Sequence, residues 1–136
     1  MAFVLDASIT LCWAFADEEH PVATAALDRI QQGEAQVPSL WWFEVRNSLI
    51  MNERRGRLTE AATSSFLRNL AQLAIIVDRA PAEAALLSLA RQHRLTVYDA
   101  AYLELAQRGG LTLATLDTAL RQAAKLVGVP LLAAVA

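Results

Sequence analysis

Three short apolar runs along the chain each end at an aspartate, and a helical pattern of apolar positions begins directly afterwards. Short apolar runs with no alternation are typical of strands buried on both faces of a parallel sheet. Residues that follow such strands and begin helices gather along the carboxyl edge of the sheet, so we expect the aspartates to lie close together. The runs are Phe3–Leu5 before Asp6, Leu95–Tyr98 before Asp99, and Leu111–Leu116 before Asp117.

The remaining pattern alternates in the same way between brief apolar runs and helical stretches. Glycine and proline fall at the boundaries of these elements, which supports the division. Further strands are predicted at Gln36–Pro38, Ala74–Val77 and Pro130–Leu132, and helices at Ser8–Phe15, from Pro21 to Gly33, at Leu40–Arg55, from Thr59, from Pro81, from Asp99 to Gly109, and from Asp117 to Gly128. Strands alternating with helices predict the α/β class, here a three-layer α/β/α sandwich with a short parallel sheet, and one domain over residues 1–136.

Composition narrows the function classes. The chain has 136 residues, 55% apolar and 19% charged, which fits a globular domain with a real core. Its net charge of −2 argues against non-specific binding of polyanions, so any contact with nucleic acid must be local or assisted by a metal. Cys12 is the only cysteine, which excludes an internal disulfide and thiolate clusters. The apolar runs fall short of the roughly 20 residues of a membrane span, and no signal peptide is apparent, so we expect a cytoplasmic protein.

Each acid has a structural explanation when it is taken alone. Aspartate is a favoured helix N-cap, typically worth about 1 kcal/mol, and this is the simpler interpretation of Asp99 or Asp117 singly. Asp6 is harder to explain, because a charge directly after a buried central strand rarely lacks a partner or a role. Glu44, in the middle of the third helix, would be a solvated residue if its neighbours were not so apolar: they include Trp41, Phe43, Val45 and Leu49.

Taken together, the acids indicate a metal site. Carboxylates gathered at one edge repel one another unless they are protonated or share a cation. An oxygen-only set suits hard cations such as Mg²⁺ or Mn²⁺. His20 and His93 lie away from the acids in this division of the chain and are expected at the surface, so a zinc site is not indicated.

The order of these residues resembles that of the PIN-domain ribonucleases, and most closely the VapC-type toxins of bacterial toxin–antitoxin pairs. The resemblance covers essentially the whole chain. It is carried by an early strand followed by Asp6-Ala7-Ser8, a helical Glu44 in mid-chain, then Asp99-Ala100-Ala101-Tyr102, and finally Thr115-Leu116-Asp117.

The resemblance implies a PIN-like fold and a function. Asp6, Glu44, Asp99 and Asp117 correspond to the family's acidic catalytic and metal-site residues, with Glu44 either a ligand or the group that positions the attacking water. Ser8 and Thr115 correspond to the hydroxyl residues that support such a site. It further implies Mg²⁺- or Mn²⁺-dependent hydrolysis of RNA, a homodimer, and a cognate antitoxin protein. In this family the residues before the third acid often form a loop, so Leu95–Tyr98 need not be a strand.

Contacts with RNA are less defined by the sequence. Arg46, Arg54, Arg55 and Arg57 could bind phosphates, but cations also gather at a solvated helix end because of the helix dipole. Trp41 or Trp42 could stack a base, although a place in the core or in a dimer interface is the simpler interpretation of both. For the dimer interface we expect exposed apolar residues of the third to fifth helices. The RNA target and the number of metal ions are left open.

Two non-enzymatic functions compete with the nuclease. A phospho-accepting receiver domain also has a parallel sheet with an acidic pocket, but it expects paired acids after its first strand and a late lysine beside a strand. Here the first strand is followed by Asp6 alone, and Lys125, the only lysine, falls within a predicted helix. A catalytically silent PIN-like scaffold is the other alternative, and the presence of all four acids argues against it.

Overall fold

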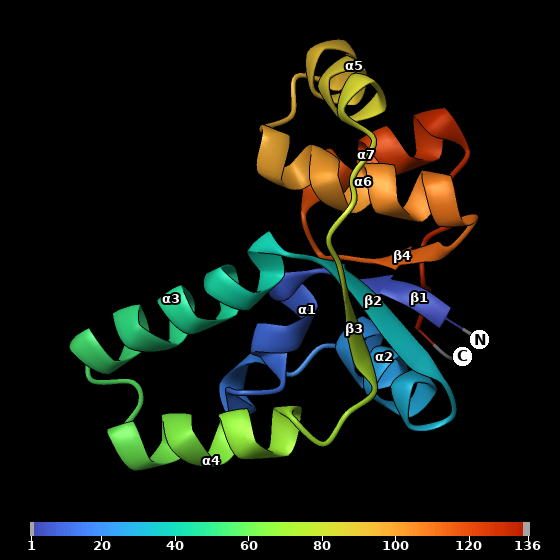
Figure 1. Ribbon diagram of the computed structural model, residues 1–136. Coiled ribbons are helices and arrows are strands. Elements are labelled where there is room, and N and C mark those ends of the chain that lie inside the picture. Colours follow the sequence, from blue (N-terminus) through green and yellow to red (C-terminus); the bar gives the residue numbers. More distant parts are fainter. Residues whose placement is uncertain (1, 135–136) are drawn as a thin grey trace.

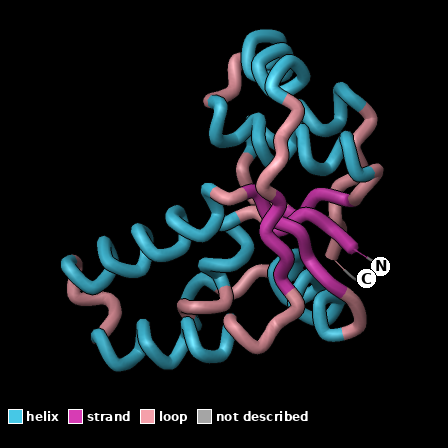
Figure 2. Tube along the Cα trace, in the orientation of Figure 1, coloured by secondary structure: helices cyan, strands magenta, loops and turns pink. Residues whose placement is uncertain are grey.

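The computed structural model describes residues 2–134, which are built around a parallel sheet of four strands in the order β3-β2-β1-β4 (Figures 1 and 2). The predicted α/β class and the parallel sheet are confirmed. In register, Phe3 lies opposite both Ala35 and Thr112, so β1 is an inner strand that pairs with β2 on one side and with β4 on the other. The strands are β1 (Ala2–Leu5), β2 (Glu34–Pro38), β3 (Ile75–Asp78) and β4 (Thr112–Ala114).

Helices cover both faces of this sheet, as a three-layer arrangement requires. The helices are α1 (Ala7–Cys12), α2 (Pro21–Gln31), α3 (Leu40–Arg54), α4 (Glu60–Leu70), α5 (Glu83–His93), α6 (Val97–Gly109) and α7 (Thr118–Val127), with a 3-10 turn η1 (Ala16–Glu18). In Figure 1, α6 and α7 lie on one face with α5 outside them, and α1 and α2 lie on the other. The pair α3–α4 extends beyond the sheet as an arm. None of the helices within residues 2–134 is long and apolar enough to cross a membrane.

The core is formed where β1 meets α6. Phe3, Val4 and Leu5 are fully buried, as expected for a strand covered on both faces. The stretch from Ala100 to Ala106 is buried along its entire length, so α6 is surrounded by protein rather than amphipathic. The alanines of this stretch are small enough to let the helix approach the sheet, and Tyr102, Leu103 and Leu105 fill the space around it.

The strand predicted at Leu95–Tyr98 is wrong. Thr96 is the N-cap of α6, and its hydroxyl accepts a hydrogen bond from the backbone N–H of Asp99 at 3.1 Å. Arg94 ends α5 in the left-handed conformation (φ 53°), so the chain turns directly from one helix into the next and leaves no room for a strand. The capping threonine, which directly precedes the helix, decides the local structure here.

Other boundaries also differ from the prediction. The predicted strand Pro130–Leu132 is reduced to one isolated bridge between Leu113 and Leu131. The first helix is shorter than Ser8–Phe15, since α1 ends at Cys12. Helix α5 begins at Glu83 rather than at Pro81, because Ala82 is still extended.

One buried carboxylate of the core is fully paired. Glu104 of α6 is 2% exposed, and both of its oxygens accept hydrogen bonds from Arg108, at 2.7 and 3.1 Å. The same guanidinium reaches Asp78 at the end of β3, where the shorter contact is 2.7 Å. This network joins α6 to the edge strand of the sheet.

We expect Arg108→Ala to destabilise the protein by about 2–4 kcal/mol, because it leaves the buried Glu104 carboxylate without its partner. The range lies below that of a fully enclosed pair because the Arg108 side chain is 37% exposed. Urea unfolding at neutral pH measures the change. The matched control is Arg91→Ala on the exposed side of α5, which we expect to stay within about 0.5 kcal/mol of the unmodified protein. Equal losses in both variants would contradict the assignment.

Candidate active site

The four predicted acids line one pocket of about 360 Å³ at the carboxyl edge of the sheet. They arrive from four places in the chain: Asp6 follows β1, Glu44 is in α3, Asp99 is in the first turn of α6, and Asp117 follows β4. The structure therefore brings together every acid that the sequence singled out. The remaining lining residues are Ala7, Ser8, Leu11, Asn47 and Ser48.

Asp6 is the most buried of these acids, at 7% exposure, and is held by two hydroxyl groups. Its Oδ2 accepts hydrogen bonds from Ser8 Oγ at 2.7 Å and from Thr115 Oγ1 at 2.6 Å. Thr115 Oγ1 in turn accepts from the backbone N–H of Asp117 at 3.1 Å. The two residues expected to support the site thus both contact Asp6, and Thr115 links it to the loop that carries Asp117.

N-capping explains only one of the aspartates. Asp117 caps α7, since its Oδ2 accepts from the backbone N–H of Leu120 at 2.8 Å. Asp6 precedes α1 but its side chain makes no capping hydrogen bond. Asp99 is not a cap, because Thr96 occupies that position. Two carboxylates therefore face the pocket without the helix-capping role that the sequence allowed them.

Glu44 is held by a residue to which sequence reasoning gave no role. The hydroxyl of Tyr102 donates a hydrogen bond to Glu44 Oε1 at 2.5 Å. One signal could have suggested this contact: Tyr102 lies three residues after Asp99 in a mostly apolar helical stretch, so its hydroxyl needs a polar partner. Asn47 and Ser48, one turn beyond Glu44, were also missed as pocket residues.

The electrostatics of the pocket oppose full ionisation. Burial raises the pKa of Asp6, and the hydrogen bonds from Thr115 and Ser8 only partly oppose it. Burial also raises the pKa values of Glu44 and Asp99, with smaller contributions from the neighbouring acids. None of the four acids forms an ion pair with an arginine or lysine within residues 2–134. The pocket thus concentrates negative charge that the described part of the protein leaves uncompensated.

Comparison with known proteins gives a consistent assignment. The PIN domain family matches residues 3–126. The chain belongs to the PIN-domain family. A relative, Ribonuclease VapC3 of Pyrobaculum aerophilum, is 35% identical over 125 residues, which cover 90% of this chain and 94% of the relative. The resemblance inferred from the sequence is therefore confirmed.

Solved structures show the same PIN fold. PAE2754 from Pyrobaculum aerophilum superimposes with a TM-score of 0.71 at 26% identity, covering 90% of this chain and 84% of that one. FitAcB from Neisseria gonorrhoeae gives a TM-score of 0.67 at 19% identity and covers 98% of this chain and 97% of that one. A toxin–antitoxin complex from Klebsiella pneumoniae gives 0.62 at 18% identity, with coverage of 98% and 99%. At these low identities the last two matches concern the fold alone.

The chemistry of the pocket fits a hard divalent cation. All four acidic donors are carboxylate oxygens, the ligands preferred by Mg²⁺ and Mn²⁺, and neither histidine lines the pocket. Over residues 2–134, however, no three His, Cys, Asp or Glu side chains already stand in an arrangement that would hold an ion. Asp6, Glu44, Asp99 and Asp117 are the residues that would hold one in this PIN domain.

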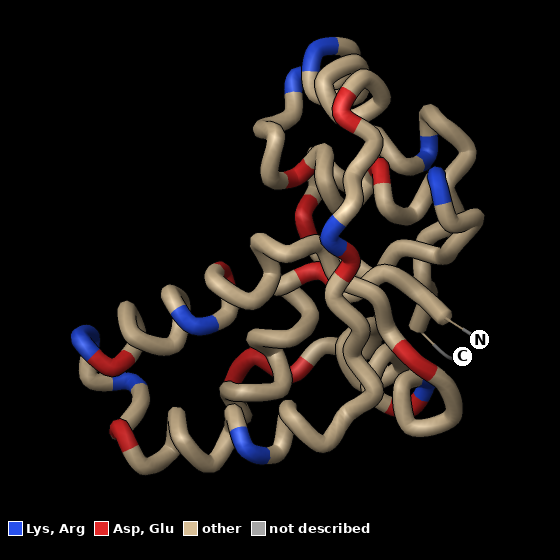
Figure 3. Tube along the Cα trace, in the orientation of Figure 1, with Lys and Arg blue, Asp and Glu red and all other residues tan. Residues whose placement is uncertain are grey.

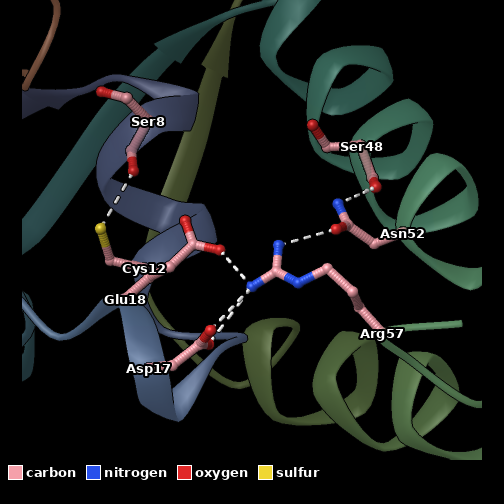
Figure 4. A network of polar contacts seen from close by, with 7 residues as sticks. All are labelled: Ser8, Cys12, Asp17, Glu18, Ser48, Asn52 and Arg57. Carbon is pink, nitrogen blue, oxygen red and sulfur yellow. Dashed lines mark hydrogen bonds and ion pairs between the residues drawn. The ribbon is translucent and has the colours of Figure 1, made fainter. Parts of the chain in front are cut away.

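The arginines considered for RNA binding lie in different surroundings. Arg57 forms ion pairs with Glu18 at 2.8 Å and Asp17 at 3.2 Å, and it donates to Asn52 Oδ1 at 2.9 Å (Figure 4). It also lies over the ring of Phe15, so it fastens the α3–α4 turn to η1 and is largely occupied. Arg54 and Arg55 are exposed where α3 ends, at the far end of the arm (Figure 3).

Arg46, Trp42 and Trp41 also differ from one another in their surroundings. The Arg46 guanidinium lies 3.8 Å from the centre of the Trp42 ring, outside the carboxylate pocket. Trp42 is 45% exposed. Trp41 is a core residue, in agreement with the simpler interpretation, and its Nε1 donates to Thr10 Oγ1 at 2.9 Å.

We expect Asp99→Asn to make the metal-free protein more stable at neutral pH. The pKa of Asp99 in the folded protein lies above its ordinary value of 3.8, so as the pH rises past this value the unfolded chain loses its proton first. The unmodified protein therefore loses stability relative to the variant as the pH rises through the folded pKa, and the two converge below pH 3.8. Unfolding in urea with EDTA, at a series of pH values, measures this difference.

The same pair of proteins tests the response to metal. At an Mn²⁺ concentration about 100 times the dissociation constant, bound metal would stabilise the unmodified protein by about 2.7 kcal/mol, and the variant by much less. Asp28→Asn, which removes an exposed acid of α2 outside the pocket, is the matched control. The electrostatic account would be contradicted if Asp99→Asn were no more stable than the unmodified protein in EDTA. It would also be contradicted if Mn²⁺ stabilised the two proteins equally.

Proposed function

We propose that this protein is a metal-dependent endoribonuclease, the toxin of a toxin–antitoxin pair, that hydrolyses RNA phosphodiester bonds in the four-carboxylate pocket. The observation that carries the proposal is the gathering of Asp6, Glu44, Asp99 and Asp117 in one pocket without a compensating arginine or lysine among the described residues. The relative named Ribonuclease VapC3 supports the reaction, and the resemblance of the sequence to VapC-type toxins supports the toxin–antitoxin setting.

We assign the acids the roles that the sequence resemblance implies. Asp6, Asp99 and Asp117 would ligate Mg²⁺ or Mn²⁺, and Glu44 would be a further ligand or would position the attacking water. A bound divalent cation lowers the pKa of water and neutralises charge that develops on the phosphate and the leaving oxygen. Ser8 and Thr115 keep Asp6 oriented through their hydrogen bonds to its Oδ2. Asn47 and Ser48 add polar groups to the wall of the pocket where the phosphodiester would lie.

The partners we propose are an RNA substrate, a cognate antitoxin protein and a second copy of this chain. Large apolar side chains are exposed on α3 and β3, and exposed apolar surface is typical of protein interfaces. Trp42, Phe43 and Ile50 of α3 and Ile76 of β3 are between 42% and 69% exposed. This surface supports the expectation of a homodimer that involves the third helix.

A receiver domain is disfavoured by the geometry. Lys125 lies in the last turn of α7 and does not line the carboxylate pocket, so the lysine that a receiver places beside its phosphoacceptor is missing from this site. A silent PIN scaffold would keep the pocket but lack the reaction, and an activity measurement separates it from the nuclease.

We expect the purified, antitoxin-free protein to cut a 5′-labelled pool of total RNA at discrete positions with Mn²⁺ or Mg²⁺ and not with EDTA. Asp99→Asn should lower the rate by more than about 100-fold, since loss of an outer-shell partner alone typically costs 10–100-fold. Asp28→Asn should cut like the unmodified protein. Identical cutting by the unmodified protein and Asp99→Asn would show a contaminating nuclease, and no cutting of any RNA would favour the silent scaffold.

We also propose that Arg54 and Arg55 contact RNA phosphates, because both are exposed and neither forms an ion pair within residues 2–134. Replacing both by alanine should weaken RNA binding and reduce the salt slope of log K by about 1–2, as expected for the loss of two contacts to a single strand. Binding is measured in EDTA at several salt concentrations. Arg91→Ala is the control, and an unchanged slope in the double variant would remove these arginines from the RNA surface.

A further inference from the structure

Tyr102 is a buried residue whose polar end reaches the edge of the carboxylate pocket. Its side chain is fully buried in α6, among the alanines and leucines that pack against the sheet. A tyrosine in such a place brings a large apolar ring together with a hydroxyl that needs a hydrogen-bond partner. Phenylalanine would serve the packing alone, so the hydroxyl is the feature to be explained.

The partner of this hydroxyl is Glu44, 58 residues away in sequence. The Tyr102 hydroxyl lies 2.5 Å from Glu44 Oε1, within hydrogen-bonding distance of the carboxylate. A phenol with its ordinary pKa of about 10 keeps its proton at neutral pH, so Tyr102 acts as the donor. Within residues 2–134, this is the one hydrogen bond made by the Glu44 side chain, which leaves Oε2 without a protein partner.

The backbone beneath Glu44 is fixed independently. Trp41, one turn earlier in α3, donates from Nε1 to Thr10 Oγ1 at 2.9 Å, and Thr10 Oγ1 donates to the carbonyl oxygen of Asp6 at 3.3 Å. The start of α3 is thereby fastened to the junction of β1 and α1. What remains free is the rotation of the half-buried Glu44 side chain, and the Tyr102 hydroxyl restricts that rotation.

We propose that Tyr102 is a positioning residue of the active site: its hydroxyl holds Glu44 through Oε1 and leaves Oε2 as the oxygen that acts on a cation or on the attacking water. The inference rests on the proposed nuclease function and assigns one residue of that site. Helix α6 then contributes two groups to the proposed site. They are the carboxylate of Asp99 and, one turn later, the Tyr102 hydroxyl that orients Glu44.

The experiment is a double-mutant cycle of Tyr102→Phe and Glu44→Ala, measured as kcat and KM for a cleaved RNA and as the dissociation constant of Mn²⁺. Tyr102→Phe removes one oxygen atom and keeps the buried ring. We expect kcat to fall about 10- to 100-fold, the range expected for a hydrogen bond to a charged group, with KM within about twofold. Glu44→Ala removes both carboxylate oxygens, so in that background Tyr102→Phe should change kcat and the Mn²⁺ dissociation constant by less than about twofold.

A second readout does not depend on activity. In crystals of the metal-free proteins grown at one pH, we expect the Glu44 side chain to leave its position in Tyr102→Phe and to keep it in the unmodified protein. The matched control is Tyr98→Phe, on the exposed first turn of the same helix, which should change neither kinetics nor structure. Far-ultraviolet circular dichroism and urea unfolding establish that each variant is folded.

Several results would overturn the assignment. If Tyr102→Phe has the same effect in the unmodified protein and in the Glu44→Ala background, the hydroxyl does not act through Glu44. If Tyr102→Phe loses stability but keeps kcat, Tyr102 serves packing alone. The same conclusion would follow if the Glu44 side chain stayed in place in crystals of Tyr102→Phe. Failure of the unmodified protein to cut RNA would instead reject the nuclease proposal, while the crystal comparison would still decide whether Tyr102 positions Glu44.

Discussion

The arrangement of the pocket depends on one buried carboxylate, Asp6, at the end of the central strand. A charge at this depth is costly unless hydrogen bonds compensate it, and its two donors come from the segments that follow β1 and β4. Ser8 belongs to α1, directly after β1, whereas Thr115 follows β4 and lies 109 residues after Asp6. Satisfying Asp6 therefore fixes the two adjacent strand ends against each other. The remaining acids are placed relative to this junction.

The two buried carboxylates Glu104 and Asp6 differ in whether the protein compensates their negative charge. Glu104 is buried like Asp6, but Arg108 binds both of its oxygens and Asp78 shares the same cation. Asp6 is held by neutral hydroxyls, which stabilise its ionised form without cancelling its charge. Arg108 compensates the charge of Glu104 within the protein, and the network joins α6 to β3. The Asp6 arrangement leaves negative charge beside Glu44, Asp99 and Asp117, and an added cation would compensate it.

The sequence predicted what is decided locally and missed what is decided by distant partners. The Phe3–Leu5 strand, its terminal aspartate and the capping of α7 by Asp117 all follow from neighbouring residues. The strand predicted at Leu95–Tyr98 failed because the apolar run concealed a helix N-cap at Thr96. Tyr102 was given no role, and Arg57 was considered for RNA binding rather than for its ion pairs. Their partners lie far along the chain, 58 residues away for Tyr102 and 39 to 40 for Arg57. No local pattern encodes such pairs.

The capping difference between Asp99 and Asp117 matters for the proposed metal site. Asp117 accepts a capping hydrogen bond at the start of α7 through its Oδ2. This bond fixes the orientation of the side chain but occupies one of its two carboxylate oxygens. Thr96 supplies the cap of α6 instead, and this releases Asp99, in the first turn of the helix, from that structural duty. An acid relieved of capping can turn toward a ligand without loosening the helix that carries it. Thr96, whose capping role explains why the strand prediction failed, thus also leaves the Asp99 carboxylate free of capping, as its proposed role as a metal ligand requires.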